Sequence, residues 1–283
     1  MQTILSGKTK QVKISSDGAF VIIGEKINPT GRKKLAAALQ EGDFKYVREL
    51  ANRQLEAGAD VLDVNVGVPG MDEVALLPRV VQMLAAEYDV PLCLDSANPD
   101  ALAAALAVAP GKSLVNSISG EEFRLDAILP VVKAYGAAVI GLAMDSTDVP
   151  KDPQKRLAIV AKILDRAAKA GIPPEDVVID PLVMTVGADH NAASVTLQTI
   201  ELVRREFGTN INLGASNVSF GLPDRDTVNM AFMAVAMHAG ATCAITDPVK
   251  MTGTIRATDL LLGRDAYGKR YVRYCRSRPK ETA

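Results

Sequence analysis

Val61-Leu-Asp63-Val-Asn65 and Pro91-Leu-Cys-Leu-Asp95 are short apolar runs that end on a carboxylate or an amide. Three more runs end in the same way: Ser113-Leu-Val-Asn116, Val177-Val-Ile-Asp180 and Leu213-Gly-Ala-Ser-Asn217. A short apolar run bounded by turn residues is typical of a strand buried on both faces. A polar residue at its end needs a partner, because burying an unpaired polar group costs a few kcal/mol. Five such ends at one rim indicate a binding site.

Apolar runs of this kind recur along the whole chain, each followed by a stretch with helical periodicity. The eight predicted strands are Phe20–Gly24, Val61–Asn65, Leu92–Asp95, Leu114–Asn116, Ala138–Ala143, Val177–Asp180, Ile211–Gly214 and Ala244–Asp247. Eight strand–helix units without a linker predict an α/β fold, a single-domain (β/α)8 TIM barrel over residues 19–256. A doubly wound open sheet is the alternative, but its Gly-x-Gly-x-x-Gly turn is missing after the first strand.

The two ends of the chain are expected to lie outside the barrel proper. Residues 1–18 are predicted to form an N-terminal extension or a hairpin, with its turn at Ser16-Asp-Gly18, that covers the barrel floor. Residues 257–283 are predicted to form a closing C-terminal helix, interrupted near Gly268, and a tail.

Composition excludes several classes of protein. A net charge of −1 offers no basic excess to neutralise nucleic-acid phosphates. Apolar stretches are interrupted well before the roughly 18 residues that a membrane span needs, and the N-terminus lacks the pattern of a signal peptide. Three widely spaced cysteines give neither a disulfide framework nor a zinc pattern. We therefore expect a cytoplasmic protein that binds neither nucleic acid nor membrane.

The carboxyl ends of barrel strands form the active site in this architecture. The polar residues expected there are Glu25, Asn28, Asp63, Asn65, Asp95, Ser96, Asn116, Ser117, Asp145, Asp180, Ser216, Asn217 and Asp247. This set has no histidine or cysteine and no strand-end lysine, so zinc, Schiff-base and serine-triad chemistry lose support. An acidic ring can bind Mg²⁺, and any single aspartate, Asp63 or Asp145 for instance, can instead cap a loop or a helix. A third use is recognition of a flat heterocycle, such as an aminopyrimidinone, by Asp95, Asn116 and Asp180.

Six segments, taken together, resemble the pterin-binding methyltransferases. They are Gly24-Glu-Lys-Ile-Asn28, Asp63-Val-Asn-Val-Gly67, Leu92-Cys-Leu-Asp-Ser96, Val115-Asn-Ser117, Ile179-Asp-Pro-Leu182 and Ser216-Asn-Val-Ser-Phe-Gly-Leu-Pro223. The resemblance is to methyltetrahydrofolate:corrinoid-protein methyltransferases and to the folate module of cobalamin-dependent methionine synthase. It runs in order along nearly the whole predicted barrel.

The resemblance implies a homodimeric barrel that moves a methyl group between N5 of tetrahydrofolate and the cobalt of a corrinoid. It assigns the pterin ligands to Asp95, Asn116 and Asp180, and the asparagine near N5, the expected catalytic residue, to Asn217. No protein-bound metal is expected. The sequence contains no Asp-x-His-x-x-Gly motif, so the corrinoid is expected on a separate corrinoid-binding protein.

Other features of the predicted site stay open. Ser216 and Ser219 flank Asn217 and can cap the next helix or contact the ligand. Candidate cations for the anionic folate tail are Lys26, Arg32, Lys151 and Arg225, each of which can equally be a solvated surface charge. The expected direction is from methylcorrinoid to tetrahydrofolate in a demethylation pathway, with the reverse direction and the original methyl donor undecided.

Two rival functions use the same pocket. A dihydropteroate synthase condenses a pterin pyrophosphate with an aminobenzoate, and the basic segment Asn28-Pro-Thr-Gly-Arg-Lys-Lys34 suits a pyrophosphate. A folate-binding module without catalysis is the second rival, against which the presence of Asn217 argues.

Overall fold

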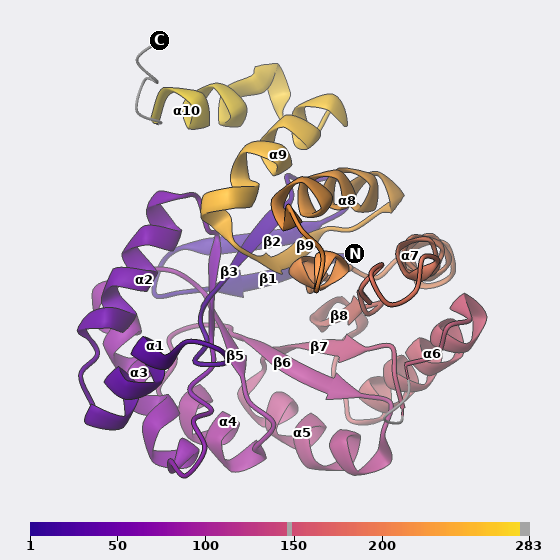
Figure 1. Cartoon of the computed structure of the whole chain (residues 1–283). Helices are drawn as coiled ribbons and strands as arrows, with labels where there is room; N and C mark the ends of the chain where they lie inside the picture. Colours follow the sequence, from indigo (N-terminus) through magenta and orange to yellow (C-terminus); the bar gives the residue numbers. More distant parts are fainter. Residues whose placement is uncertain (146–148, 278–283) are drawn as a thin grey trace.

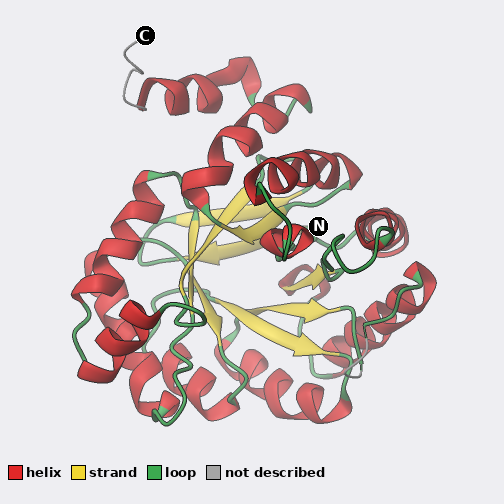
Figure 2. Ribbon diagram, in the orientation of Figure 1, coloured by secondary structure: helices red, strands yellow, loops and turns green. Residues whose placement is uncertain are grey.

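Seven parallel strands curl into a barrel surrounded by helices in the computed structural model, which describes residues 1–145 and 149–277 (Figures 1 and 2). Their order in the sheet is β8-β7-β6-β5-β4-β3-β9. The strands are β3 (Val21–Ile27), β4 (Val61–Val64), β5 (Leu92–Asp95), β6 (Leu114–Ser119), β7 (Ala138–Leu142), β8 (Val177–Asp180) and β9 (Cys243–Thr246). The prediction of a single-domain α/β barrel is confirmed.

The eighth barrel position differs from the prediction of a strand at Ile211–Gly214. This segment makes only two isolated parallel bridges, Ile179 with Ile211 and Gly214 with Ile245, which join it to β8 and β9. The Ile211 N–H donates to the hydroxyl of Thr242, at 2.9 Å, instead of to a ladder carbonyl. A side chain has thus replaced a strand–strand bond, so the segment closes the barrel without forming a regular strand.

Two strands extend beyond their predicted ends. β3 continues past Gly24 to Ile27, and β6 continues past Asn116 to Ser119. Both carry a register shift, in β3 between Gly24 and Ile27 and in β6 between Asn116 and Ile118. Such irregularities re-aim side chains next to binding sites, and apolar patterning does not reveal them.

The described part of the chain contains ten α-helices, most of which surround the barrel. They are α1 (Lys33–Glu41), α2 (Lys45–Glu56), α3 (Glu73–Glu87), α4 (Pro99–Leu106), α5 (Glu122–Tyr135), α6 (Pro153–Lys169), α7 (Ala192–Phe207), α8 (Arg225–Ala239), α9 (Pro248–Leu261) and α10 (Lys269–Ser277). Short 3-10 helices are η1 (Pro174–Asp176), η2 (Ala215–Ser219) and η3 (Ala266–Gly268). One apolar core lies between sheet and helices, and a second fills the barrel interior. Figure 1 shows α10 beyond α9, on the outside of the molecule.

An N-terminal hairpin packs against the interior core. Its strands β1 (Gln2–Ser6) and β2 (Gln11–Ser15) pair antiparallel. Leu5, Val12 and Ile14 are buried in the same cluster as inward-facing residues of the barrel strands. The turn of this hairpin lies between residues 6 and 11 and not at Ser16–Gly18, and the carboxylate of Asp89 accepts hydrogen bonds from the backbone N–H groups of Thr9 and Lys10 there.

Candidate active site

A cavity of about 290 Å³ opens where the barrel strands end. It is lined by Glu25, Asn28, Thr30, Arg32, Asp63, Asp95, Asn116, Gly214, Ser216, Asn217 and Ile245. We call it the central cavity. A neighbouring cavity of about 230 Å³ shares Asp95 and Asn116 with it and extends past Ser96, Ser117 and Arg124. Seven of the predicted rim residues and the candidate folate-tail cation Arg32 therefore line one cavity.

Three amide–carboxylate pairs hold the carboxylates and the amide of the predicted pterin site. The Asn65 amide donates to Asp95 at 3.0 Å, and the Asn116 amide donates to Asp63 at 3.3 Å. In the third pair, Asn212 Nδ2 donates to Asp180 Oδ2 at 2.8 Å. We call these six residues the clamp side. Each predicted pterin ligand thus has a second polar side chain that fixes its rotamer, which is how a binding site is preorganised.

Burial changes the acidity of the clamp-side carboxylates. Burial, together with the nearby charge of Asp95, raises the pKa of Asp63 to about 8, and burial also raises the pKa of Asp95. Burial raises the pKa of Asp180 to about 6, although hydrogen bonds from the Leu182 N–H and the Asn212 amide oppose the shift. At neutral pH Asp63 is therefore mostly a neutral acid, whereas Asp180 is mostly an ionised acceptor.

Asp180 lies deeper than the other two predicted ligands. It ends β8, only 6% of its surface is exposed, and it does not belong to the lining of the central cavity. Buried Arg156 of α6 lies near it and favours its ionised form. The guanidinium of Arg156 donates to the carbonyls of Pro181 and Leu182, at 2.6 and 2.9 Å, which fixes the turn that follows Asp180.

The other side of the central cavity is built from ion pairs and contacts to η2. Lys26 Nζ lies 2.7 Å from Glu25 Oε1 and 2.8 Å from Asp247 Oδ2. The Ser216 hydroxyl donates to Glu25 Oε2 at 3.1 Å, and Arg225 Nη2 donates to the Ser216 carbonyl at 2.6 Å. We call Glu25, Lys26, Ser216, Arg225 and Asp247 the ionic side. They line a further cavity of about 140 Å³.

Local backbone geometry explains how β3 presents Glu25 and Lys26. The Lys26 N–H donates to the side chain of Gln54 on α2, at 2.8 Å, where the register of β3 shifts. A Cβ at Gly24 would lie 2.4 Å from the same Gln54 oxygen, so this close approach requires glycine.

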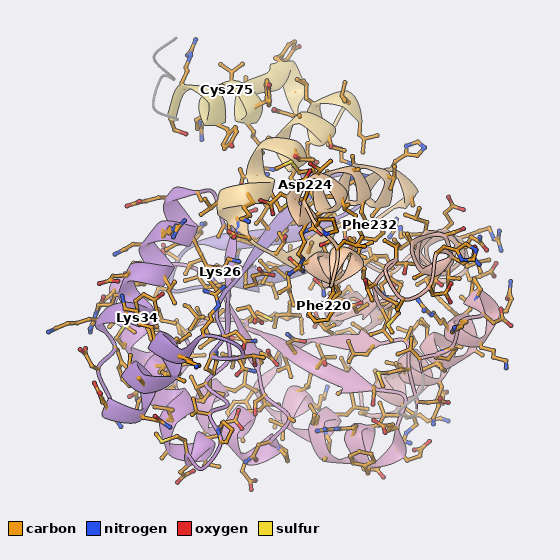
Figure 3. The ribbon with its side chains drawn as sticks, in the orientation of Figure 1. Lys26, Lys34, Phe220, Asp224, Phe232 and Cys275 are labelled. Atoms are coloured by element: carbon orange, nitrogen blue, oxygen red, sulfur yellow. The ribbon has the colours of Figure 1, made fainter. Side chains whose placement is uncertain are left out.

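Asn217 lies on η2 and faces the central cavity. Its Nδ2 lies beside Gly214, where an added Cβ would be 3.2 Å away. Phe220, just after η2, is 66% exposed, and Figure 3 shows it near the middle of the view together with Lys26 of β3. An amide group therefore stands at the edge of the cavity on a short segment that side chains from other elements hold.

Several other predicted site residues order the loops of this rim. Asn28 accepts from the Thr30 N–H and Ser96 accepts from the Asn98 N–H. Ser219 is buried and accepts from Arg225. Asp247 follows β9 as the N-cap of α9, in addition to its ion pair with Lys26.

Three predicted residues stand apart or differ in setting. Asp145 is exposed and lines a separate surface cavity beyond β7. Lys151 is 82% exposed and pairs with Asp189 at 3.0 Å. Ser117 follows Asn116 across a cis peptide bond and lines the neighbouring cavity, not the central one.

The sequence prediction missed three residues of the site region. Asn212 could have been predicted from the sequence, because a polar residue inside the apolar run Ile211–Gly214 needs a buried partner. The sequence does not indicate that Arg156 and Arg124 belong to the site, because arginines in helices usually face solvent. Arg124 lines the cavity beside Asp95 and donates to the Ala97 carbonyl at 2.9 Å.

Within residues 1–145 and 149–277, no group of three or more His, Cys, Asp or Glu side chains is arranged to hold a metal ion. None of the helices in this same part of the chain has both the length and the apolar composition to cross a membrane.

Two curated proteins are similar in sequence to this chain. The chain is 32% identical, over 260 residues, to the methylcorrinoid:tetrahydrofolate methyltransferase of Eubacterium limosum, covering 89% of this chain and 94% of that one. It is 28% identical to the methionine synthase of Mycobacterium tuberculosis over 85% of this chain, which spans 21% of that protein.

Solved structures show the same fold at low sequence identity. The dihydropteroate synthase of Yersinia pestis superposes with a TM-score of 0.70 at 18% identity, over 93% of this chain and all of that one. The enzyme from Clostridium difficile, solved in the presence of pteroic acid, gives 0.71 at 20% identity, over 87% of this chain and 98% of that one. The sequence profile described as pterin binding enzyme matches residues 24–247, the barrel that carries the site. The chain therefore belongs to the family of pterin-binding enzymes.

Proposed function

We propose that this protein is a methyltransferase that moves a methyl group from a methylcorrinoid to N5 of tetrahydrofolate. The observation that carries the proposal is the clamp side, in which three amide–carboxylate pairs hold Asp95, Asn116 and Asp180, the residues that we propose contact a flat ligand. The similarity of the chain to the Eubacterium limosum enzyme supports both the proposed substrates and the proposed direction of transfer. The reverse direction would use the same site.

The clamp side suits the edge of a reduced pterin. Its 2-amino group and ring N–H groups are donors, and the ionised carboxylate of Asp180 can accept two of them. The amide nitrogen of Asn116 donates to Asp63, which orients its amide oxygen as an acceptor for the ligand. Asp95, held by Asn65, provides a further acceptor on the neighbouring strand. We propose Asp95, Asn116 and Asp180 as the pterin ligands.

Asn217 is the proposed catalytic residue. Methyl transfer is an in-line displacement, for which the protein mainly has to hold both partners in the right orientation. In the proposed direction N5 attacks the methyl carbon, the cobalt–carbon bond breaks with its electron pair staying on cobalt, and N5 carries a positive charge until its proton passes to water. The oxygen of an amide beside N5 can accept a hydrogen bond from this N–H and stabilise the charge, and in the reverse direction the amide N–H can donate to N5. Asn217 can act in both directions without being an acid, and it faces the central cavity from η2.

A separate protein is proposed to present the corrinoid. The sequence contains no Asp-x-His-x-x-Gly motif, while the barrel itself accounts for the match to the family. We further propose a cytoplasmic homodimer, as the resemblance to the methyltransferases implies. Light scattering of the purified protein measures its mass in solution, and a mass near 30.0 kDa would contradict the dimer.

An anaerobic assay tests the proposed reaction. Purified protein is mixed with methylcobalamin and tetrahydrofolate, and the absorbance change of the cobalamin is followed while methyltetrahydrofolate is quantified. Formation of methyltetrahydrofolate at the rate of cobalamin demethylation is the expected result. Condensation of a pterin pyrophosphate with 4-aminobenzoate would instead favour a synthase, and folate binding without turnover would favour a binding module.

A further inference from the structure

A continuous line of contacts connects three elements of the ionic side. Asp247, the N-cap of α9, pairs with Lys26 of β3, and Lys26 pairs with its neighbour Glu25. Glu25 then accepts from Ser216 on η2, 191 positions along the chain. The side chains of Glu25, Lys26 and Asp247 are 25%, 20% and 13% exposed, so the contacts are partly shielded from water. Partly buried ion pairs are screened less than those on the surface.

The element at the end of this line depends on contacts from outside itself. η2 has five residues and 3-10 geometry, whose hydrogen bonds are poorer than those of an α-helix. It is followed by the exposed Phe220 and by Gly221 at φ +80°. Glu25 and Arg225 both hold Ser216, the residue that directly precedes Asn217. The position of the Asn217 amide therefore depends on side chains from β3 and α8.

Both carboxylate oxygens of Glu25 are already engaged. Oε1 lies against Lys26 and Oε2 accepts from Ser216. Lys26 in turn is shared between two carboxylates, which offsets its charge and makes it a poor partner for an anionic folate tail. These contacts hold η2 in place, whereas on the clamp side Asp63, Asp95 and Asn116 line the central cavity.

We propose that Glu25 is a positioning residue that holds η2, and thereby the Asn217 amide, against the central cavity through Ser216. Lys26 and Asp247 keep the carboxylate of Glu25 in the orientation that Ser216 needs. This inference rests on the proposed methyl transfer and deepens it, because it assigns to the reacting side of the cavity a residue that acts through another.

Two variants test the hydrogen bond between Ser216 and Glu25, one at each partner. Glu25→Gln keeps the size of the side chain and removes its charge, and Ser216→Ala removes only the hydroxyl. A hydrogen bond to a charged group is worth enough to change a rate by roughly tenfold, so each variant should lower kcat by about that factor. The KM for tetrahydrofolate should stay within about twofold of wild type, because the clamp side is untouched. Melting temperatures show whether each variant is folded, and if Glu25→Gln is not, Ser216→Ala decides.

The double variant separates positioning from an independent role. If Glu25 acts through Ser216, the two losses should not multiply, and Glu25→Gln/Ser216→Ala should be about as slow as either single variant. Lys26→Arg should keep most of the rate that Lys26→Met loses. Lys250→Met is the matched control. Lys250 lines the cavity of about 140 Å³ together with the ionic side, but its ion pair is with Asp226 of α8 and does not involve η2.

The experiment is the methylcobalamin assay with saturating tetrahydrofolate, run on all variants beside wild type. The proposal is supported if kcat falls in Glu25→Gln and Ser216→Ala, not further in the double variant, and not in Lys250→Met. Unchanged kcat, a loss confined to KM, or losses that multiply would overturn it. Failure of the proposed function would be seen separately, as the absence of turnover by wild type.

Discussion

The clamp side and the ionic side both contribute residues to the central cavity, and different interactions hold them in place. On the clamp side each carboxylate accepts from a side-chain amide, and burial raises the pKa values of Asp63 and Asp180 although these hydrogen bonds oppose the shift. On the ionic side, partly exposed ion pairs brace a short 3-10 helix. The paired, buried carboxylates are therefore suited to binding a flat ring, whereas the ionic side is suited to placing one amide beside the reacting atom.

The largest effect that we predict is on the catalytic rate, from a change at Asn217. Replacing it by alanine should lower kcat by about 100-fold, because a hydrogen bond aimed at developing charge is lost. The affinity for tetrahydrofolate, measured by calorimetric titration, should change by no more than about threefold, since the clamp side holds the pterin. Unchanged turnover at saturating folate would remove Asn217 from the reaction.

Asp180 should give the opposite result. Asp180→Asn replaces an acceptor-only carboxylate by an amide, so a pterin N–H would face an N–H group, and binding should weaken by roughly 30-fold. Turnover at saturating tetrahydrofolate should recover to within a few-fold of wild type. The pH dependence has a defined sign: as the pH falls through about 6, Asp180 takes up a proton and folate binding should weaken. Calorimetry between pH 5 and 8 measures both effects, and wild-type affinity in the variant would reject the assignment.

Asp63 makes a prediction about stability instead of binding. Its pKa of about 8 in the folded protein lies above the ordinary aspartate value, so the folded state holds a proton that the unfolded chain has released. Stability that is present at low pH is therefore lost as the pH rises toward 8. Asp63→Asn removes this loss, and the variant should exceed wild type by roughly 2 kcal/mol at pH 9 relative to pH 6. Urea unfolding at the two pH values measures this difference. The same change in the free energy of unfolding between pH 6 and pH 9 in both proteins would contradict the prediction.

The smallest expected effect concerns the folate tail. Arg32 lines the central cavity, whereas Lys151 is exposed and paired with Asp189. Arg32→Gln should weaken tetrahydrofolate binding by about threefold and leave binding of a tetrahydropterin without the tail unchanged, as expected for one partly exposed charge contact. Lys151→Met should change neither affinity. Equal losses for both ligands in Arg32→Gln would place Arg32 on the pterin instead.

The two sides also differ in how far the sequence reveals them. The places of Asp95, Asn116 and Asp180 on β5, β6 and β8 were predictable, because each ends an apolar run that forms a barrel strand. The pairing of Asn116 with Asp63 follows only from register, and that of Asp180 with Asn212 from a segment that is not a regular strand. Lys26 was a candidate for the folate tail until the fold placed Asp247, 221 positions away, beside it. Local patterns predict which residues reach the rim, and long-range pairing decides what each does there.

One measurement tests the division between binding and reaction most directly. Single-turnover methyl transfer from methylcobalamin is recorded for wild type, Asp180→Asn and Asn217→Ala while tetrahydrofolate is raised to saturation. We predict that Asp180→Asn approaches the wild-type rate at high tetrahydrofolate, whereas Asn217→Ala stays about 100-fold slower at every concentration. A rate in Asn217→Ala that recovers with tetrahydrofolate, or one in Asp180→Asn that does not, would contradict the account.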